Sequence, residues 1–204
     1  IELASKATLL ATTIIIAFGL VFYATKKTSR ARFFIVGLVG LTLSIFFITR
    51  IDSLKKRFIT GFRDDLAQTA DYKEVSEPRM MRWQCALTLA RESPIIGHGT
   101  GTERRLLKDQ YFKKRLYNSY LHELNAHNQY LSFLIKTGII GLAVFLCTLY
   151  IGFRTAWRSH DFVFTSFIIL VATVCLSENI LDVNKGVVFY SFFFSFFMMS
   201  KSNA

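Results

Sequence analysis

Proline, cysteine and charged residues are all scarce in this chain of 204 residues. It contains 2 Pro and 3 Cys, and 19% of its residues are charged, compared with about a quarter in an average soluble domain. The few Cys residues show neither a disulfide framework nor a metal-binding spacing, which excludes a disulfide-stabilised secreted scaffold. Hydrophobic residues make up 52% of the chain, with 21 Phe, and the mean hydropathy is +0.36. These values exclude a disordered chain and an ordinary cytosolic enzyme.

The hydrophobic residues are gathered in long uncharged runs instead of following the period of an amphipathic helix or strand. About 20 apolar residues span a bilayer as a helix, because a helix satisfies its own backbone hydrogen bonds in lipid. Buried helices of a soluble protein are the alternative, and the near absence of amphipathic surface disfavours it. The sequence therefore predicts an all-α integral membrane protein with about five transmembrane helices, at 7–24, 33–49, 137–153, 162–177 and 186–200.

Basic residues in the short connections give these predicted helices an orientation. The connection at 26–32 is rich in Lys and Arg, and Arg154 and Arg158 follow the third run. Such loops stay in the cytoplasm, which places the N-terminus outside and the C-terminus inside. We therefore predict two transmembrane helices in 1–49, a large, partly helical extracytoplasmic loop in 50–127, and three transmembrane helices in 128–204.

The formal net charge of +11 does not indicate nucleic-acid binding in this context. Part of the excess lies in the short cytoplasmic loops and the rest in the long outer loop, which includes Lys55, Arg104 and Arg115. A basic outer loop fits a solvated face beside anionic membrane lipids, and it equally fits a site for an anionic lipid-linked substrate.

A helix is predicted within the outer loop, from Ser76 as N-cap to Ser93-Pro94, which ends a helix. Its packed face is predicted from apolar residues at helical spacing: Met80, Trp83, Leu87 and Ala90. Arg79 lies one turn before Trp83, at the edge of that face. There its guanidinium either extends to solvent or pairs with a carboxylate.

Two further motifs in the loop contain residues suited to substrate binding or proton transfer. Gly97, Gly99 and Gly101 alternate and predict a tight turn or a contact with substrate, but the buried strand of a dinucleotide-binding fold does not precede them. His127 lies at the outer end of the third transmembrane run, next to Asn128. An imidazole there either transfers protons near neutral pH or only bridges the interface.

These motifs resemble the O-antigen ligase and O-antigen polymerase superfamily of bacterial inner-membrane glycosyltransferases. The resemblance rests on Arg79-x-x-x-Trp83 with Glu92-Ser93-Pro94-Ile95-Ile96-Gly97-x-Gly99-x-Gly101, on Asn125-Ala126-His127-Asn128-Gln129-Tyr130-Leu131 with Gly138-Ile139-Ile140-Gly141, and more weakly on Ser177-Glu178-Asn179 with Gly186-Val187-Val188-Phe189-Tyr190 and on Leu3-Ala4-Ser5-Lys6-Ala7. Together these stretches cover nearly the whole chain. Such ligases are similar to twelve-span proteins with the large periplasmic loop between spans nine and ten. The chain is therefore expected to be the C-terminal portion of a longer protein.

The resemblance implies an inverting, metal-independent glycosyltransferase of the bacterial inner membrane that uses no cofactor. The implied donor is a glycan on undecaprenyl diphosphate. The acceptor is the lipid A-core for a ligase, another repeat unit for a polymerase, or a protein in a third group of relatives. A transporter subunit is an alternative of a different class, but it predicts charges or broken helices within the membrane runs, which contain essentially none.

The resemblance also implies roles for individual residues. Arg79 is expected to contact the leaving diphosphate, since a guanidinium meets phosphate oxygens with two parallel hydrogen bonds. Lys6 is a second cation, although the family more often has Arg there, and His127 is the general base that deprotonates the acceptor hydroxyl. Glu178 either orients His127 or Arg79 or is a solvated carboxylate. The remaining predicted substrate-binding residues are Gly97, Gly99, Gly101 and Asn128.

Overall fold

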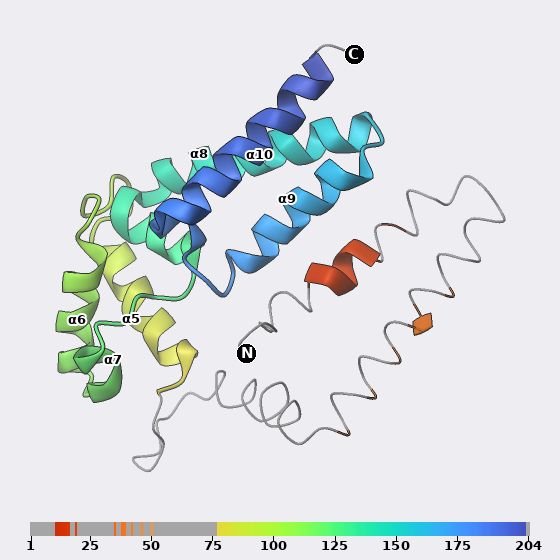
Figure 1. Cartoon of the computed structure of the whole chain (residues 1–204). Coiled ribbons are helices and arrows are strands. Elements are labelled where there is room, and N and C mark those ends of the chain that lie inside the picture. The colour runs from red at the N-terminus through yellow and green to blue at the C-terminus, as the bar shows by residue number, and fades with distance from the viewer. Residues whose placement is uncertain are drawn as a thin grey trace. The chain divides into compact units, whose positions relative to one another are not determined.

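The computed structural model of the chain describes residues 11–16 and 77–202, together with the isolated positions 19, 35, 38, 39, 42, 46 and 50 (Figure 1). Residues 11–16 are helical. Lys6 lies outside the described residues, as do most of the predicted helices at 7–24 and 33–49. In the described part, every regular element is a helix and none is a strand, which confirms the predicted all-α class.

The elements after residue 77 follow one another through short connections (Figure 1). They are α5 (Arg79–Glu92), α6 (Glu103–Lys113), α7 (Tyr117–Leu121), α8 (Gln129–Arg158), α9 (Phe162–Val174), the 3₁₀ turn η3 (Ile180–Asp182) and α10 (Asn184–Ser202). Most of each apolar run predicted as the third, fourth or fifth membrane helix is helical, although α9 ends at Val174, before the end of the run predicted at 162–177. The number of membrane crossings stays a prediction.

In the described part of the chain, α8 is long and apolar enough to cross a membrane, whereas α9 is apolar but shorter. A break divides α8 at Gly138, whose φ of 63° and ψ of −160° lie outside the helical region. The stretch from Ile139 to Arg158 has a length of about 30 Å at 1.5 Å per residue, which matches the hydrocarbon core of a bilayer.

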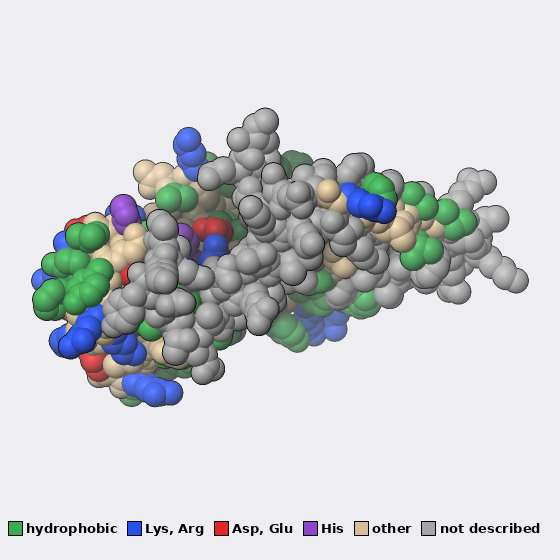
Figure 2. Space-filling view, turned by 90° about the horizontal axis from the view of Figure 1, so that it is seen from below, with side chains coloured by type: hydrophobic (Ala, Val, Ile, Leu, Met, Phe, Trp, Pro, Cys, Tyr) green, Lys and Arg blue, Asp and Glu red, His purple; other side chains and the backbone are tan. Residues whose placement is uncertain are grey.

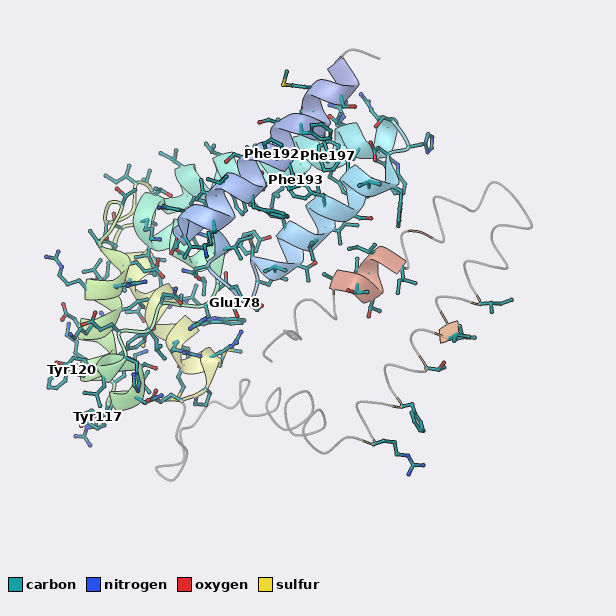
Figure 3. All side chains as sticks on the ribbon, in the orientation of Figure 1. Tyr117, Tyr120, Glu178, Phe192, Phe193 and Phe197 are labelled. Carbon is teal, nitrogen blue, oxygen red and sulfur yellow. The ribbon has the colours of Figure 1, made fainter. Side chains whose placement is uncertain are left out.

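The chain divides into two compact units, and residues 149–174 and 189–202 belong to the first. Stacked aromatic rings join α9 to α10 in this unit, as in the pair Phe164 and Phe197, whose centroids lie 5.1 Å apart (Figure 3). Gly152 of α8 lies against both helices: a Cβ there would be 2.8 Å from Ile168 and from Phe194. Close helix packing at this point therefore requires glycine.

The second unit includes residues 77–148 and 175–188. Its hydrophobic core is formed by Cys85, Ala86, Leu89, Leu107, Tyr111, Leu116, Ala126 and Ile135. These residues come from α5, α6, α8 and the connections between them. The core thus fixes the segment before α8, where His127 lies, against α5 and α6.

The end of α5 matches the prediction, but its start and its packed face do not. Pro78, not Ser76, precedes the first helical residue, and Ser93 follows the last. The predicted face was right at Ala90, which is buried, and wrong at Leu87, which is 40% exposed. Cys85 and Leu89, which are at most 2% exposed, were not predicted. The buried face consists largely of small or polar residues, so the positions of the large apolar side chains indicated the wrong side.

Candidate functional site

The glycine motif after α5 packs directly on the broken segment of α8. The backbone N–H of His98 donates to the carbonyl of Ile135 at 2.8 Å, and that of Gly99 donates to Lys136 at 2.9 Å. Gly97 has a φ of +69°, and a Cβ there would be 2.5 Å from the backbone of Lys136. The tight turn and close backbone approach predicted for this motif are therefore present, and they hold the first turns of α8 in place.

The three glycines differ in what they can contact. Gly97 and Gly99 face the backbone of α8 or form the turn, and Gly101 lines a cavity of about 430 Å³. The substrate contact predicted for Gly97 and Gly99 stays a prediction.

Asn128 is the N-cap of α8. Its side-chain Oδ1 accepts hydrogen bonds from the backbone N–H groups of Tyr130 at 3.0 Å and Leu131 at 3.2 Å, which would otherwise have no partner at a helix start. Its own backbone N–H donates to Oδ1 of Asn179 at 2.7 Å. The polar atoms of Asn128 thus fix the start of α8, and its predicted contact with substrate stays a prediction.

Arg79 and His127, near the starts of α5 and α8, both contact Glu178, which is labelled in Figure 3. Nδ1 of His127 lies 3.4 Å from one carboxylate oxygen of Glu178, and Nη2 of Arg79 lies 3.9 Å from the other. Arg79 also donates from Nη1 to the carbonyl of Ser177 at 3.1 Å. The side chains of Arg79, His127 and Glu178 are 28%, 29% and 41% exposed, so each is held by the protein and still open to a ligand.

The electrostatics of this cluster keep Glu178 ionised. The hydrogen bond from His127 is the largest cause of its lowered pKa, and the charges of His127, Arg79 and Arg82 act in the same direction against partial burial. An ionised carboxylate only accepts hydrogen bonds, so Nδ1 of His127 carries the shared proton. The Nε2 atom of a neutral His127 is then left as the proton acceptor.

The backbone of His127 is in the left-handed region, with a φ of 47°. Glycine adopts this region without cost and other residues do so at some cost, as Arg115, Glu123 and His160 also do in this chain. The backbone N–H of His127 donates to Oδ1 of Asn125 at 3.1 Å, within the same short segment.

A second polar cluster, which the sequence analysis missed, lies beneath this site in the same unit. Lys136 of α8 contacts Oε2 of Glu103 at 3.0 Å and Oδ2 of Asp182 at 2.7 Å. Burial is the largest single influence on the pKa of Asp182, and it raises that pKa. Hydrogen bonds from Lys136, Asn179 and Gln129 together outweigh burial, so the pKa is lowered and Asp182 stays ionised. Lys136, directly before an apolar run, was the sequence signal for this cluster, because a charge at the edge of a membrane helix needs a partner.

One cavity adjoins the Lys136 cluster and another adjoins His127. The cavity of about 430 Å³ is lined by Gly101, Phe133, Lys136 and Asp182, together with Arg104 and Asn125. A cavity of about 440 Å³ is lined by His127 and His122 and again by Arg104 and Asn125.

Lys and Arg side chains are frequent on the face over α5–α7, with Asp, Glu and His among them (Figure 2). This surface suits an anionic ligand.

Over the described residues, no three His, Cys, Asp or Glu side chains are grouped so that they could hold a metal ion. The positive charges available at the site are those of Arg and Lys.

The geometry defines a class of site: a partly exposed imidazole that a carboxylate orients, with an arginine on the same carboxylate and polar cavities beside it. Such a site is suited to proton abstraction from a hydroxyl next to an anionic group. The sequence model of the O-antigen ligase family matches residues 2–146, which is more than half of the chain, and the protein belongs to this family. No individual curated protein matches the chain.

The matched region includes most of the predicted site. It contains Lys6, Arg79, His127, Asn128 and the three glycines of the turn, whereas Glu178 lies beyond it. The contact of Glu178 with His127 and Arg79 therefore comes from the tertiary structure.

Proposed function

We propose that the protein is an O-antigen ligase, a membrane glycosyltransferase that moves a glycan from undecaprenyl diphosphate to a sugar hydroxyl of the lipid A-core. Membership of the O-antigen ligase family supports the reaction class. The observation that carries the assignment of roles is the contact of His127 and Arg79 with opposite oxygens of one carboxylate, Glu178.

In the proposed reaction, Nε2 of His127 removes the proton from the acceptor hydroxyl. The hydroxyl oxygen then forms a bond with the anomeric carbon as the bond from that carbon to the diphosphate oxygen breaks. The electron pair of the broken bond leaves with the undecaprenyl diphosphate, so a direct displacement inverts the anomeric centre. Glu178 stabilises the imidazolium that forms, which is the role of a carboxylate on the other ring nitrogen.

Arg79 is proposed to stabilise the negative charge that develops on the leaving diphosphate. Its guanidinium already contacts Glu178 and the Ser177 carbonyl, which fixes it near His127 and leaves part of it exposed. Hydrogen-bond donors that are already positioned where negative charge develops stabilise the transition state by about 3 kcal/mol each. Lys6 is proposed as a second cation, so the reaction needs no metal ion.

We further propose that the protein lies in the bacterial inner membrane as a multi-pass protein, with the site on the periplasmic side. Both substrates are lipid-linked, so the site must lie close to the membrane surface. The apolar stretch of α8 after Gly138, with His127 and the cavities before it, fits this placement.

The second candidate function is an O-antigen polymerase, in which the acceptor is the terminal sugar of another carrier-linked glycan. Donor chemistry and the roles of His127 and Arg79 are the same in both reactions. The two differ only in the acceptor, so a glycan analysis of the product separates them.

The test is a lipopolysaccharide gel from a strain that lacks the intact gene, with and without complementation. Core without polymer, with polymer left on its lipid carrier, identifies a ligase, whereas core with a single repeat identifies a polymerase. Complementation with His127→Ala or Arg79→Ala should fail, and with His160→Ala, a histidine beyond the end of α8, it should succeed. Normal transfer by well-inserted His127→Ala protein would contradict the assigned role.

A further inference from the structure

We infer that Glu103 and Lys136 are positioning residues for His127, and that the buried polar cluster to which they belong fixes the backbone on both sides of the imidazole. This inference rests on the proposed function only in taking His127 as the general base. The hydrogen bonds that carry it involve described residues of one compact unit.

The two residues that flank His127 each have a backbone N–H that is held by a side chain from another part of the fold. The backbone N–H of Ala126 donates to Oε1 of Glu103, at the start of α6, at 3.3 Å. The backbone N–H of Asn128 donates to Oδ1 of Asn179, in the segment before η3, at 2.7 Å. The main chain of His127 is thus attached on either side to two different parts of the fold.

A third attachment comes from α5. Nε1 of Trp83 donates to the carbonyl of Ala126 at 2.9 Å, one turn after Arg79 in the same helix. The helix that presents the arginine therefore also contacts the residue before the histidine. This contact relates the two catalytic side chains to each other through α5.

Glu103 and Asn179, which hold the residues on either side of His127, are also hydrogen-bonded to each other. Nδ2 of Asn179 donates to Oε1 of Glu103 at 3.4 Å and to Oδ2 of Asp182 at 3.0 Å. Lys136 contacts both carboxylates from α8 and neutralises part of their charge. Gln129 of α8 also donates to Asp182, so the cluster connects α6, α8 and the segment before α10.

The burial of this cluster explains why its members depend on one another. The side chain of Glu103 is 3% exposed and that of Lys136 is 18% exposed. A buried charge is tolerated only when it is paired and its remaining hydrogen-bonding capacity is used. Ser132 supplies a further hydrogen bond to Glu103, so the carboxylate is held on both oxygens.

The backbone conformation of His127 explains why the hydrogen bonds to its neighbours matter. Its φ of 47° is unfavourable for a residue with a side chain, so the segment would relax to a different turn without external contacts. A small displacement of a general base lowers the rate of proton transfer strongly, because catalysis depends on the near-attack geometry. Glu103 and Lys136 therefore act through the backbone of His127 and need not touch the substrate.

A matched control exists in the same unit. Glu77 also holds backbone N–H groups with a carboxylate: it accepts from Asn118 at 2.7 Å and from Ser119 at 2.8 Å, at the start of α7. These contacts are with the backbone of α7, whereas that of Glu103 is with the backbone beside His127. A merely structural role for Glu103 predicts the same outcome for substitutions at Glu77 and Glu103, whereas positioning predicts different ones.

The experiment measures steady-state glycan transfer by the intact protein in lipid nanodiscs, using a lipid-linked glycan donor and purified lipid A-core. The variants are Glu103→Ala, Glu103→Gln, the pair Glu103→Gln with Lys136→Met, and the control Glu77→Ala. Glu103→Ala should lower kcat about tenfold or more, with the donor KM changed less than about twofold, because it misplaces the base without removing a substrate contact. Glu103→Gln keeps an oxygen acceptor for Ala126 and should recover part of kcat.

Hydrogen exchange of the backbone amides at 126–128 provides a readout that does not depend on activity. Exchange there should accelerate in Glu103→Ala and stay unchanged in Glu77→Ala. Where Glu103→Ala does not fold, the charge-balanced pair Glu103→Gln with Lys136→Met takes its place. The new amide keeps an acceptor for Ala126 but the ion pair to α8 is lost, so exchange should accelerate and kcat should fall in the same direction, each by less than in Glu103→Ala.

Two outcomes overturn the inference: a kcat loss in Glu103→Ala that Glu77→Ala matches at equal loss of thermal stability, or a rise in KM with kcat unchanged. A His127→Ala protein with normal activity instead refutes the proposed function. In that case the exchange result still decides whether Glu103 fixes the backbone of residue 127.

Discussion

Nδ1 of His127 lies 3.4 Å from Oε2 of Glu178, although 51 positions separate the two residues in the sequence. The contact orients the imidazole and assigns the proton to Nδ1, so Nε2 is directed to the acceptor hydroxyl in the proposed reaction. The same carboxylate contacts Arg79, so one acidic side chain positions both the base and the cation.

Replacing Glu178 tests this arrangement. In Glu178→Gln the amide keeps a hydrogen-bond acceptor for His127 but loses the charge that stabilises the imidazolium, so kcat should fall about tenfold or more, as for other oriented bases. The measurement is steady-state glycan transfer in nanodiscs. Asp109→Asn is the control, because Asp109 is an exposed carboxylate of α6 that lines neither cavity. Equal activity of Glu178→Gln and wild type would leave Glu178 as a solvated loop residue.

The lowered pKa of Glu178 predicts how stability depends on pH. The unfolded chain binds a proton at Glu178 near the ordinary value of 4.5, whereas the folded protein, in which His127 donates to the carboxylate, binds it only at lower pH. The contribution of Glu178 is therefore complete above about pH 4.5 and is lost as the pH falls through the folded value. The difference in thermal unfolding midpoint between wild type and Glu178→Gln should shrink from pH 6 to pH 3. A constant difference would contradict the lowered pKa.

In the glycine turn, alanine should be tolerated at Gly101 but not at Gly97. Gly97→Ala combines a left-handed φ with a Cβ 2.5 Å from the backbone of α8, and it should cost about 3 kcal/mol or more of unfolding free energy. Gly101 also has a positive φ, but no atom lies within 4 Å of a Cβ there, so Gly101→Ala should cost only about 1 kcal/mol. Denaturant unfolding of both variants measures the difference. Similar losses would mean that the turn does not pack on α8.

Trp83→Phe should reduce transfer while leaving the packing of α5 in place. The phenyl ring keeps most of the contact area and removes the N–H that donates to the carbonyl of Ala126, a hydrogen bond worth about 1 kcal/mol. We expect kcat to fall about two- to fivefold, because about 1 kcal/mol of lost hydrogen-bond energy corresponds to at most about a fivefold change in rate. Trp157→Phe, a substitution in the last turn of α8, is the control. A larger effect at Trp157 would show that general packing, not the Ala126 contact, is responsible.

Several features follow from the sequence alone because they depend on local chemistry. Continuous apolar runs must satisfy their backbone hydrogen bonds internally, so the helices around 137–153, 162–177 and 186–200 were predictable. Proline after Ser93 ends α5 where expected. The motifs around Arg79 and His127 indicated the family, which the match over residues 2–146 confirms.

Other features were decided only by the tertiary structure, because they depend on which distant groups meet. The break in α8 at Gly138 lies near the start of the apolar run at 137–153 and arises where the backbone of Pro94 and Ile95 packs against it. The buried face of α5 is set by the position of α6, so its own pattern of large apolar residues did not reveal it.

The polar cluster shows the same limit most clearly. Asn179 and Glu103 are 76 positions apart, and their contact depends on α6, α8 and the segment before α10 folding together. Sequence supplied an imidazole and a guanidinium of suitable chemistry, since a side chain carries its chemistry wherever it lies. Their orientation by Glu178 and the fixed backbone of His127 came from tertiary contacts, because distance and direction between side chains exist only in the folded chain.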